Sequence, residues 1–188
     1  MRKTKVDVIV IGAGQAGLAI SYYLTRAKIE HVILERGSIA NAWKNERWDS
    51  FCLVTPNWTI NLPSALPSSV DPDAFMKKDD FVKLLENWAK SFRAPVMEGV
   101  CVSDLSRTGE DFKILTDSHI FLANQVIIAT ATYQRPKVPQ MLRNLDPQWE
   151  LKTAIDYKNP SSLREGAVLV VGSGQSGCQI AEELNNAG

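Results

Sequence analysis

Residues 6–35 read VDVIVIGAGQAGLAISYYLTRAKIEHVILE, and this stretch decides the fold. Its apolar, β-branched run at 8–11 is typical of a buried parallel strand and stops at a glycine-rich turn. Apolar residues at helical spacing follow the turn, and a second apolar run at 31–34 ends in Glu35. This order of strand, glycine turn, helix, strand and acid predicts a Rossmann-like unit that binds a dinucleotide.

Each part of the turn has a predicted role. The turn consists of Gly12, Ala13, Gly14, Gln15, Ala16 and Gly17. Gly12 permits the tight turn, Gly14 lets a pyrophosphate approach the backbone, and Gly17 lets the helix pack closely on the strand. The helix N-terminus directs N–H groups at the phosphates, and Glu35 can accept hydrogen bonds from a ribose hydroxyl. The alternative is a structural unit whose glycines serve only packing; the strand, helix and acid in register argue against it.

The composition excludes several classes of function. The chain has 188 residues, enough for one domain or parts of two, and its 21 Lys+Arg balance 21 Asp+Glu, so no basic surface favours nucleic acid. Cys52, Cys101 and Cys178 lie far apart without a CxxC pattern, which favours incidental thiols in a reducing compartment over disulfides or a metal site. No apolar stretch approaches the ~20 residues of a membrane span. We therefore expect a cytoplasmic protein with no membrane partner.

Residues 36–160 predict loops, one helix and short strands. The helix is expected at 79–92, with strands at 51–54, 96–102, 112–116, 119–122 and 125–129, of which 112–116 and 119–122 form a hairpin. His119 is expected to be a solvated residue of that hairpin. The loop after Glu35 carries Trp43, Trp48 and Trp58, whose indoles either plug a cleft or wall a flat aromatic ligand, and its composition favours the plug.

The opening unit is repeated near the end of the sequence. An apolar run at 167–171 predicts a strand, and a helix through Ile180 and Leu184 follows the second turn. That turn consists of Gly172, Ser173, Gly174, Gln175, Ser176 and Gly177. The strand that would supply a partner for the ribose or 2′-phosphate does not follow, so we expect the front part of a longer protein. Two dinucleotide turns imply electron transfer between two bound nucleotides.

Four stretches together resemble the flavin-dependent monooxygenases with two dinucleotide-binding domains. They are GAGQAG with Glu35, the segment from Trp43 through RWD and LVTPN, ATATYQRPKVP at 129–139, and GSGQSG. That family includes the FMO-type enzymes, the Baeyer–Villiger enzymes and the plant auxin-forming monooxygenases. The resemblance implies an α/β fold: a Rossmann-like parallel sheet with a small β-hairpin element forms an FAD-binding domain over 1–145. A linker at 146–165 then leads to the start of a second Rossmann-like, NAD(P)-binding domain at 166–188.

The family also implies a reaction. NADPH, or NADH as the alternative for this chain, reduces FAD, O₂ adds to give a C4a-peroxyflavin, and that species oxygenates a small organic substrate. Beyond the two turns and Glu35, the resemblance implies cofactor contacts from Arg36, Trp43, Arg47, Trp48, Val102, Ala129 and Thr130. Asn57 and Asp49 are the candidate catalytic residues, as polar contacts near the peroxide. The alternatives are a turn-forming role for Asn57 and an ion pair with Arg47 for Asp49.

Two departures from the family pattern open other functions. Ala131 stands where members carry the glycine of an ATG motif. The family's F-x-G-x-x-x-H-[ST] stretch, which helps hold NADP, should fall near 147–154, where this chain has Pro147, Trp149, Thr153 and Ala154. The missing histidine favours an FAD/NAD(P)H reductase or dehydrogenase that does not oxygenate. A non-catalytic FAD-binding fragment is a further alternative, and a disulfide reductase is weakened by the absence of CxxC.

Overall fold

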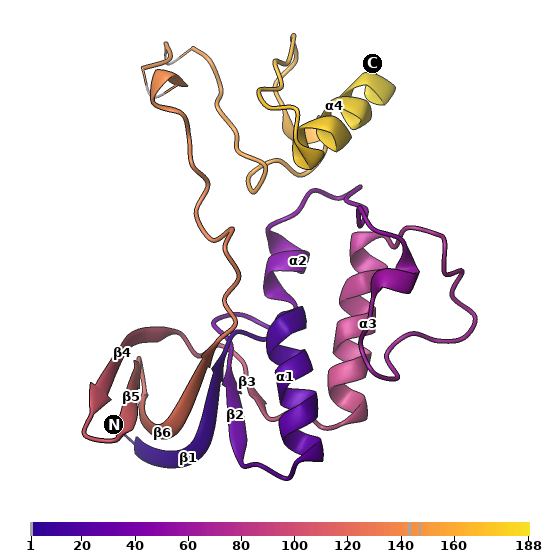
Figure 1. Cartoon of the computed structure of the whole chain (residues 1–188). Helices are drawn as coiled ribbons and strands as arrows, with labels where there is room; N and C mark the ends of the chain where they lie inside the picture. The colour runs from indigo at the N-terminus through magenta and orange to yellow at the C-terminus, as the bar shows by residue number, and fades with distance from the viewer. Residues whose placement is uncertain (1, 143, 147) are drawn as a thin grey trace. The chain divides into compact units, whose positions relative to one another are not determined.

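A computed structural model describes residues 2–142, 144–146 and 148–188, which form two compact units (Figure 1). The first unit contains the chain up to Asn41, Leu62–Ser68 and Val82–Thr132. The second contains Ala42–Asn61, Ser69–Phe81 and Tyr133–Gly188. Pro147, which begins the stretch that departs from the family pattern, lies outside the described residues.

A six-stranded sheet in the order β3-β2-β1-β6-β5-β4 organises the first unit. Its strands are β1 (Arg2–Ile11), β2 (His31–Leu34), β3 (Val96–Met97), β4 (Val102–Thr108), β5 (Asp111–Thr116) and β6 (His119–Ile128). Strand β1 pairs in parallel with β2 and β6, and β2 pairs in parallel with β3. Strand β5 pairs antiparallel with β4 and β6. The predicted α/β class is therefore confirmed, and the hairpin extends one edge of the parallel sheet.

Four of the strands predicted between residues 51 and 129 differ in the structure. The strands expected at 119–122 and 125–129 are one strand, β6, because β1 is ten residues long and pairs with β6 from His119 to Ile128. The strand expected at 51–54 is wrong: Cys52 makes only an isolated bridge to Lys77. The strand expected at 96–102 shortens to the two residues of β3, since β2 offers only Ile33 and Leu34 as pairing partners.

Helices α1 (Gln15–Arg26) and α3 (Lys78–Ser91) lie side by side against this sheet (Figure 1). The ring of Tyr22 stacks on that of Trp88 at 5.5 Å, and the Trp88 indole N–H donates to the Pro63 carbonyl at 2.9 Å. The predicted helix at 79–92 is confirmed to within one residue at each end. The fully buried residues of the first unit include Val10, Leu18, Ile33 and Leu85, and a separate buried cluster of sheet residues contains Ile9, Leu34 and Ile114. These residues hold the end of β1 rigidly where the first glycine turn begins.

The second unit is less regular. It contains most of α2 (Asn41–Asn45), the 3₁₀ turns η1 (Asn57–Thr59), η2 (Gln140–Leu142) and η3 (Pro160–Ser162), and α4 (Gln175–Ala187). Its apolar core consists of Trp48, Phe51 and Tyr157, against which Ile180 and Leu184 of α4 pack. None of the helices in the described residues is long and apolar enough to cross a membrane.

The strand predicted at 167–171 is absent, although the helix predicted after it is confirmed as α4. Val168, Leu169 and Val171 are 49%, 86% and 63% exposed. A parallel strand needs a neighbour with which to exchange hydrogen bonds, and none of the described residues pairs with this segment. The strand prediction is therefore wrong for these residues. An apolar run of this kind is typical of a strand buried within a sheet, and here no described strand lies beside it.

Candidate dinucleotide site

The first glycine turn leaves β1 at a position that only glycine occupies without strain. Gly12 has φ +107°, and its N–H donates to the Leu34 carbonyl at 2.8 Å. A Cβ at this position would lie 2.6 Å from the Ala129 carbonyl oxygen. The turn is thus enclosed by β2 on one side and by the end of β6 on the other.

The other two glycines differ in what surrounds them. A Cβ on Gly17 would collide with the Gly12 carbonyl oxygen, so this residue allows α1 to approach the turn. A Cβ on Gly14 would meet no atom within 4 Å. The space beside Gly14 is therefore open to a ligand, as expected for a backbone that a diphosphate approaches.

The first turn of α1 offers donors to an anion. Gly14 is the N-cap residue, no side chain caps it, and the Leu18 N–H makes the bond to the Gly14 carbonyl at 3.0 Å. The N–H groups of 15–17 precede that bond and have no acceptor within the helix. The first turn carries no acidic residue, so the positive end of the helix dipole is uncompensated by its own side chains. This arrangement fits a phosphate group.

Glu35 is held at this turn by both of its carboxylate oxygens. One oxygen, Oε2, accepts the Ala13 N–H at 2.8 Å, and Oε1 accepts the Gly37 N–H at 2.9 Å. The residue is 8% exposed, and its own N–H and carbonyl bond to Met97 and Val100. Because each carboxylate oxygen has two lone-pair sites, Glu35 retains the capacity to accept a ribose hydroxyl.

The other cofactor contacts predicted in the first unit lie either beside the glycine turn or away from it. Ala129 follows β6 beside the turn, with its N–H donating to the Ile11 carbonyl at 2.8 Å, and Thr130 comes next. Arg36 is exposed directly after Glu35, and Val102, the first residue of β4, is half-buried against the cluster that contains Ile9 and Leu34. The structure therefore gathers the turn, Glu35, Ala129 and Thr130 at the carboxyl ends of β1, β2 and β6, where ligands bind in open α/β sheets.

Ala131 has a backbone conformation that the sequence could not show. Its φ is +59°, in the left-handed region that favours glycine. This chain adopts the conformation with a residue that carries a Cβ.

The three tryptophans of the loop do not form one surface. Trp48 is 1% exposed in the core of the second unit, while Trp58 is 66% exposed. Trp43 contacts Phe51 and is covered by the Arg47 guanidinium at 5.4 Å from its ring centroid. The interpretation as a plug holds for Trp48, and Trp43 with Arg47 forms a partly exposed stack.

Asn57 and Asp49 are held by different partners. The Asn57 backbone N–H donates to Ala74 and its side-chain amide donates to the Asp71 carbonyl, each at 2.9 Å. These bonds join the start of η1 to residues 71–74, which fits a turn-forming role. Its Oδ1 is buried and has no hydrogen-bond partner among the described residues, which leaves an acceptor available.

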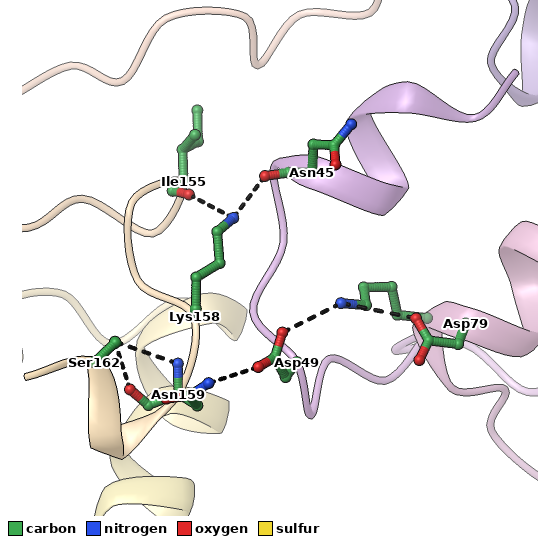
Figure 2. Close-up of polar contacts among 8 residues, drawn as sticks. Asn45, Asp49, Asp79, Ile155, Lys158, Asn159 and Ser162 are labelled. Carbon is green, nitrogen blue, oxygen red and sulfur yellow. Dashed lines mark hydrogen bonds and ion pairs between the residues drawn. The ribbon is translucent and has the colours of Figure 1, made fainter. Parts of the chain in front are cut away.

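Asp49 belongs to a polar network instead (Figure 2). Its Oδ2 accepts the Asn159 side-chain N–H at 2.6 Å, and its Oδ1 lies 3.6 Å from the Lys78 ammonium. The ion pair of Asp49 is thus with Lys78 and not with Arg47. Lys78, whose side chain is 8% exposed at the start of α3, was missed from the sequence because a lysine beside two acids is typical of a solvated helix end.

The second glycine turn repeats the geometry of the first. Gly172 has φ +116°, a Cβ on Gly177 would collide with the Gly172 carbonyl oxygen, and a Cβ on Gly174 would meet nothing within 4 Å. Helix α4 begins after Gly174, and Cys178 N–H donates to the Gly174 carbonyl at 3.0 Å. Gly172, Ser173, Gly174, Gln175 and Ser176 are exposed and Gly177 is half-buried. No counterpart of Glu35 faces this turn in the described part of the chain.

The stretch that departs from the family pattern forms a small turn. The Thr153 hydroxyl and N–H both donate to Asp156 Oδ2, at 2.7 and 3.2 Å, and these bonds lower the pKa of Asp156. The next residue, Tyr157, is buried and donates its hydroxyl to Glu183 of α4 at 2.6 Å. Burial, followed by the bond to Glu183, raises the pKa of Tyr157.

Comparison with known proteins places this geometry in a family. Residues 9–188 match the family model of pyridine nucleotide-disulphide oxidoreductases. An uncharacterized CzcO-like oxidoreductase of Geobacillus kaustophilus is 41% identical over 182 residues, which cover 96% of this chain and 51% of the relative. The indole-3-pyruvate monooxygenase YUCCA4 of Oryza sativa is 26% identical over 202 residues, covering 96% of this chain and 46% of the relative. The chain spans about half the length of the relatives it matches.

Solved structures agree with the fold. A double mutant of the flavin monooxygenase from Stenotrophomonas maltophilia has a TM-score of 0.86 at 29% identity, over 97% of this chain and 55% of that protein. A bacillithiol disulfide reductase from Staphylococcus aureus has a TM-score of 0.84 at 19% identity, over 98% of this chain and 55% of that protein, a likeness of fold alone.

Proposed function

The chain belongs to the pyridine nucleotide-disulphide oxidoreductase family, and from that membership we propose that its first glycine turn binds FAD within a flavin-dependent, NAD(P)H-using oxidoreductase. One observation carries the proposal: the Glu35 carboxylate lies 2.8 Å from the Ala13 N–H of the turn. A diphosphate beside Gly14 and an adenosine ribose beside Glu35 would then be adjacent, as they are in a dinucleotide.

The protein's part in binding follows from its own groups. The N–H groups at the start of α1 neutralise the diphosphate, and the open space beside Gly14 admits it. Glu35 accepts from the ribose, and its bonds to Ala13 and Gly37 fix its carboxylate before the ligand arrives, which reduces the entropy lost on binding. We further assign cofactor contacts to Arg36, Val102, Ala129 and Thr130 in the first unit. From the resemblance alone, Trp43 and Arg47 remain proposed cofactor contacts, whereas Trp48 is buried in the core with Phe51 and Tyr157.

We propose that the second turn, at Gly172–Gly177, belongs to an NAD(P) site. On this view residues 1–145 are the FAD-binding part, 146–165 a linker and 166–188 the start of the NAD(P)-binding part. The repeated glycine geometry supports the assignment, and the exposed run at 167–171 is explained if the whole protein supplies the rest of that sheet. NADP is the favoured nucleotide because the resemblance is to enzymes that use NADPH.

For the whole protein we propose a monooxygenase reaction that consumes NAD(P)H and O₂, in which one oxygen atom enters a small organic substrate and the other leaves as water. When bound, the flavin supplies the redox chemistry, and the protein's task is to bind, orient and exclude water. The names of the relatives support oxygenation: a flavin monooxygenase and an indole-3-pyruvate monooxygenase both exceed 25% identity. Asn57 remains the proposed polar contact for the reaction, through its unpartnered Oδ1.

A second function is a reductase or dehydrogenase that does not oxygenate. The observation in its favour is that Thr153 stands where the family has histidine, and that its hydroxyl donates a hydrogen bond to Asp156. A third, a non-catalytic FAD-binding fragment, would retain the first turn without turnover.

The test is a titration of the purified chain with FAD, followed by NADPH under anaerobic conditions and then by O₂. Bound FAD with an absorption band near that of free flavin is the expected first result, and no uptake of FAD contradicts the proposal. In a preparation of the whole protein, oxygen consumption without an equal yield of hydrogen peroxide, in the presence of substrate, supports oxygenation. An equal yield with every substrate tried supports the reductase.

A further inference from the structure

Hydrogen bonds join two loops of the second unit (Figure 2). They involve four residues, Asn45, Asp49, Lys158 and Asn159, here called the clasp. From one loop, the Asp49 N–H donates to the Lys158 carbonyl at 2.7 Å, and the Asp49 carboxylate accepts the Asn159 amide at 2.6 Å. From the other, the Lys158 ammonium donates to the Asn45 carbonyl at 2.6 Å. Each loop therefore supplies both a donor and an acceptor to the other.

The clasp uses charges where they are favourable. Asn45 is the last residue of α2, so the Lys158 ammonium lies at the negative end of that helix. Asp49 is the anion of the clasp, and the buried Lys78 ammonium lies 3.6 Å from its second oxygen. Both Asp49 oxygens are thus engaged within the protein: one by an amide donor, the other by a cation.

The clasp lies beside the contacts that dock α4. Cys52, three residues after Asp49, exchanges two hydrogen bonds with the Gln179 side-chain amide, at 3.4 and 3.0 Å. Tyr157, the residue before Lys158, donates to Glu183 at 2.6 Å. The two loops that the clasp joins are therefore the same two that hold α4, the helix of the second glycine turn.

We propose that Asp49 is a positioning residue: through the clasp it fixes the two loops that dock α4 and thereby sets how the second glycine turn is presented to its nucleotide. The inference rests on the proposed function only in taking Gly172–Gly177 as a nucleotide turn. It is an alternative to the expectation that Asp49 is a polar contact near the peroxide.

The chemistry of Asn159 allows a test in which one substitution reverses another. The Asn159 Oδ1 also accepts the Ser161 hydroxyl of η3 at 2.7 Å, and an aspartate oxygen can accept the same hydroxyl. Asn159→Asp therefore keeps this bond but places a second carboxylate against Asp49, which breaks the clasp by repulsion. Adding Asp49→Asn restores one donor and one carboxylate in exchanged positions, and Lys78 keeps its ion pair with Asp79 at 3.8 Å. A residue that acted only through general packing would not show this reversal.

The measurement is amide hydrogen exchange of the full chain, with peptides covering 155–163 and α4. Asn159→Asp is expected to speed exchange in both regions by roughly threefold to tenfold, and the double variant Asp49→Asn/Asn159→Asp should return to within about twofold of the original chain. The matched control is Asp111→Asn in the Asn159→Asp background, which removes an ion pair with Lys5 in the first unit and should not rescue.

Unchanged exchange in Asn159→Asp, or no recovery in the double variant, overturns the inference. FAD uptake, measured on the same samples, separates the two proposals. Uptake of FAD without the exchange pattern refutes the clasp alone, and the exchange pattern without uptake of FAD refutes the proposed function alone.

Discussion

The Glu35 carboxylate accepts the Ala13 N–H at 2.8 Å, although the two residues are 22 positions apart in the chain. The bond joins the end of β2 to the glycine turn that follows β1. It places an acceptor for a ribose beside donors for a diphosphate, and the proposed function depends on this placement.

The glycines of the first turn should separate folding from binding. Gly17→Ala forces a Cβ onto the Gly12 carbonyl and is expected to destabilise the chain by about 2 kcal/mol or more. Gly14→Ala meets no atom, so it should cost less than about 1 kcal/mol, through weaker capping of α1, yet weaken FAD binding by about tenfold or more. Urea unfolding and flavin fluorescence titration measure the two effects.

The matched control for Gly14→Ala is Gly174→Ala, because Gly174 has the same N-cap position and the same open surroundings in the second turn. It should leave FAD affinity unchanged. Equal losses of FAD affinity in both variants would show that the effect arises from the helix cap and not from a ligand beside Gly14.

Ala131→Gly should stabilise the protein. The left-handed φ of +59° costs an alanine about 1–2 kcal/mol, which glycine avoids. Glycine also makes the unfolded chain more flexible, and this offsets part of the stabilisation. We expect a net gain of about 0.5–1 kcal/mol by urea unfolding. The control is Ala27→Gly at φ −77°, which should lose stability; a loss in both variants would contradict the strain at Ala131.

Asp156 should titrate below the usual range. Its pKa is lowered by the Thr153 hydroxyl and N–H, so the stability that these bonds contribute is present above the unfolded value of about 3.9 and is lost as pH falls through the folded pKa. Thr153→Val removes the hydroxyl donor and should move the pKa of Asp156 upward, as measured by carboxyl NMR shifts. An unchanged titration would mean that Thr153 is free to serve another group.

Tyr157 gives the opposite dependence at alkaline pH. Burial and the bond to Glu183 raise its pKa, so the folded chain keeps a proton that the unfolded chain loses near pH 10. The corresponding stability is complete below pH 10 and is lost as pH rises through the folded pKa. Tyr157→Phe should be about 1 kcal/mol less stable at pH 7, with the difference shrinking above pH 10 in urea unfolding. A difference independent of pH would contradict the role of the hydroxyl.

The first unit could be predicted because its signals are local. The glycines, the β-branched run and Glu35 each report a constraint within 6–35, and the structure places them together. The length of β6 was not predictable from its own residues, since β1 determines where its pairing continues. The left-handed conformation of Ala131 also escaped prediction because alanine carries no sequence signal for it.

The second unit was less predictable because its contacts join distant segments. Asp49 and Asn159 are 110 positions apart, and nothing in either residue type predicts a contact with the other. Lys78 likewise lies at the start of an acidic helix turn, where solvent exposure is the usual expectation. The run at 167–171 has the pattern of a buried strand but lacks a partner among the described residues.

Titration of the chain with FAD and with FMN tests the central claim most directly, because FMN lacks the diphosphate bridge and the adenosine ribose that Glu35 is proposed to bind. The original chain should bind FAD at least about tenfold more tightly than FMN, and Glu35→Gln should weaken FAD by about tenfold while leaving FMN within about twofold. Glu98→Gln, which alters an exposed carboxylate that accepts the Ile39 N–H at 2.7 Å, should change neither. Equal affinity for FAD and FMN, or unchanged FAD affinity in Glu35→Gln, would contradict the account.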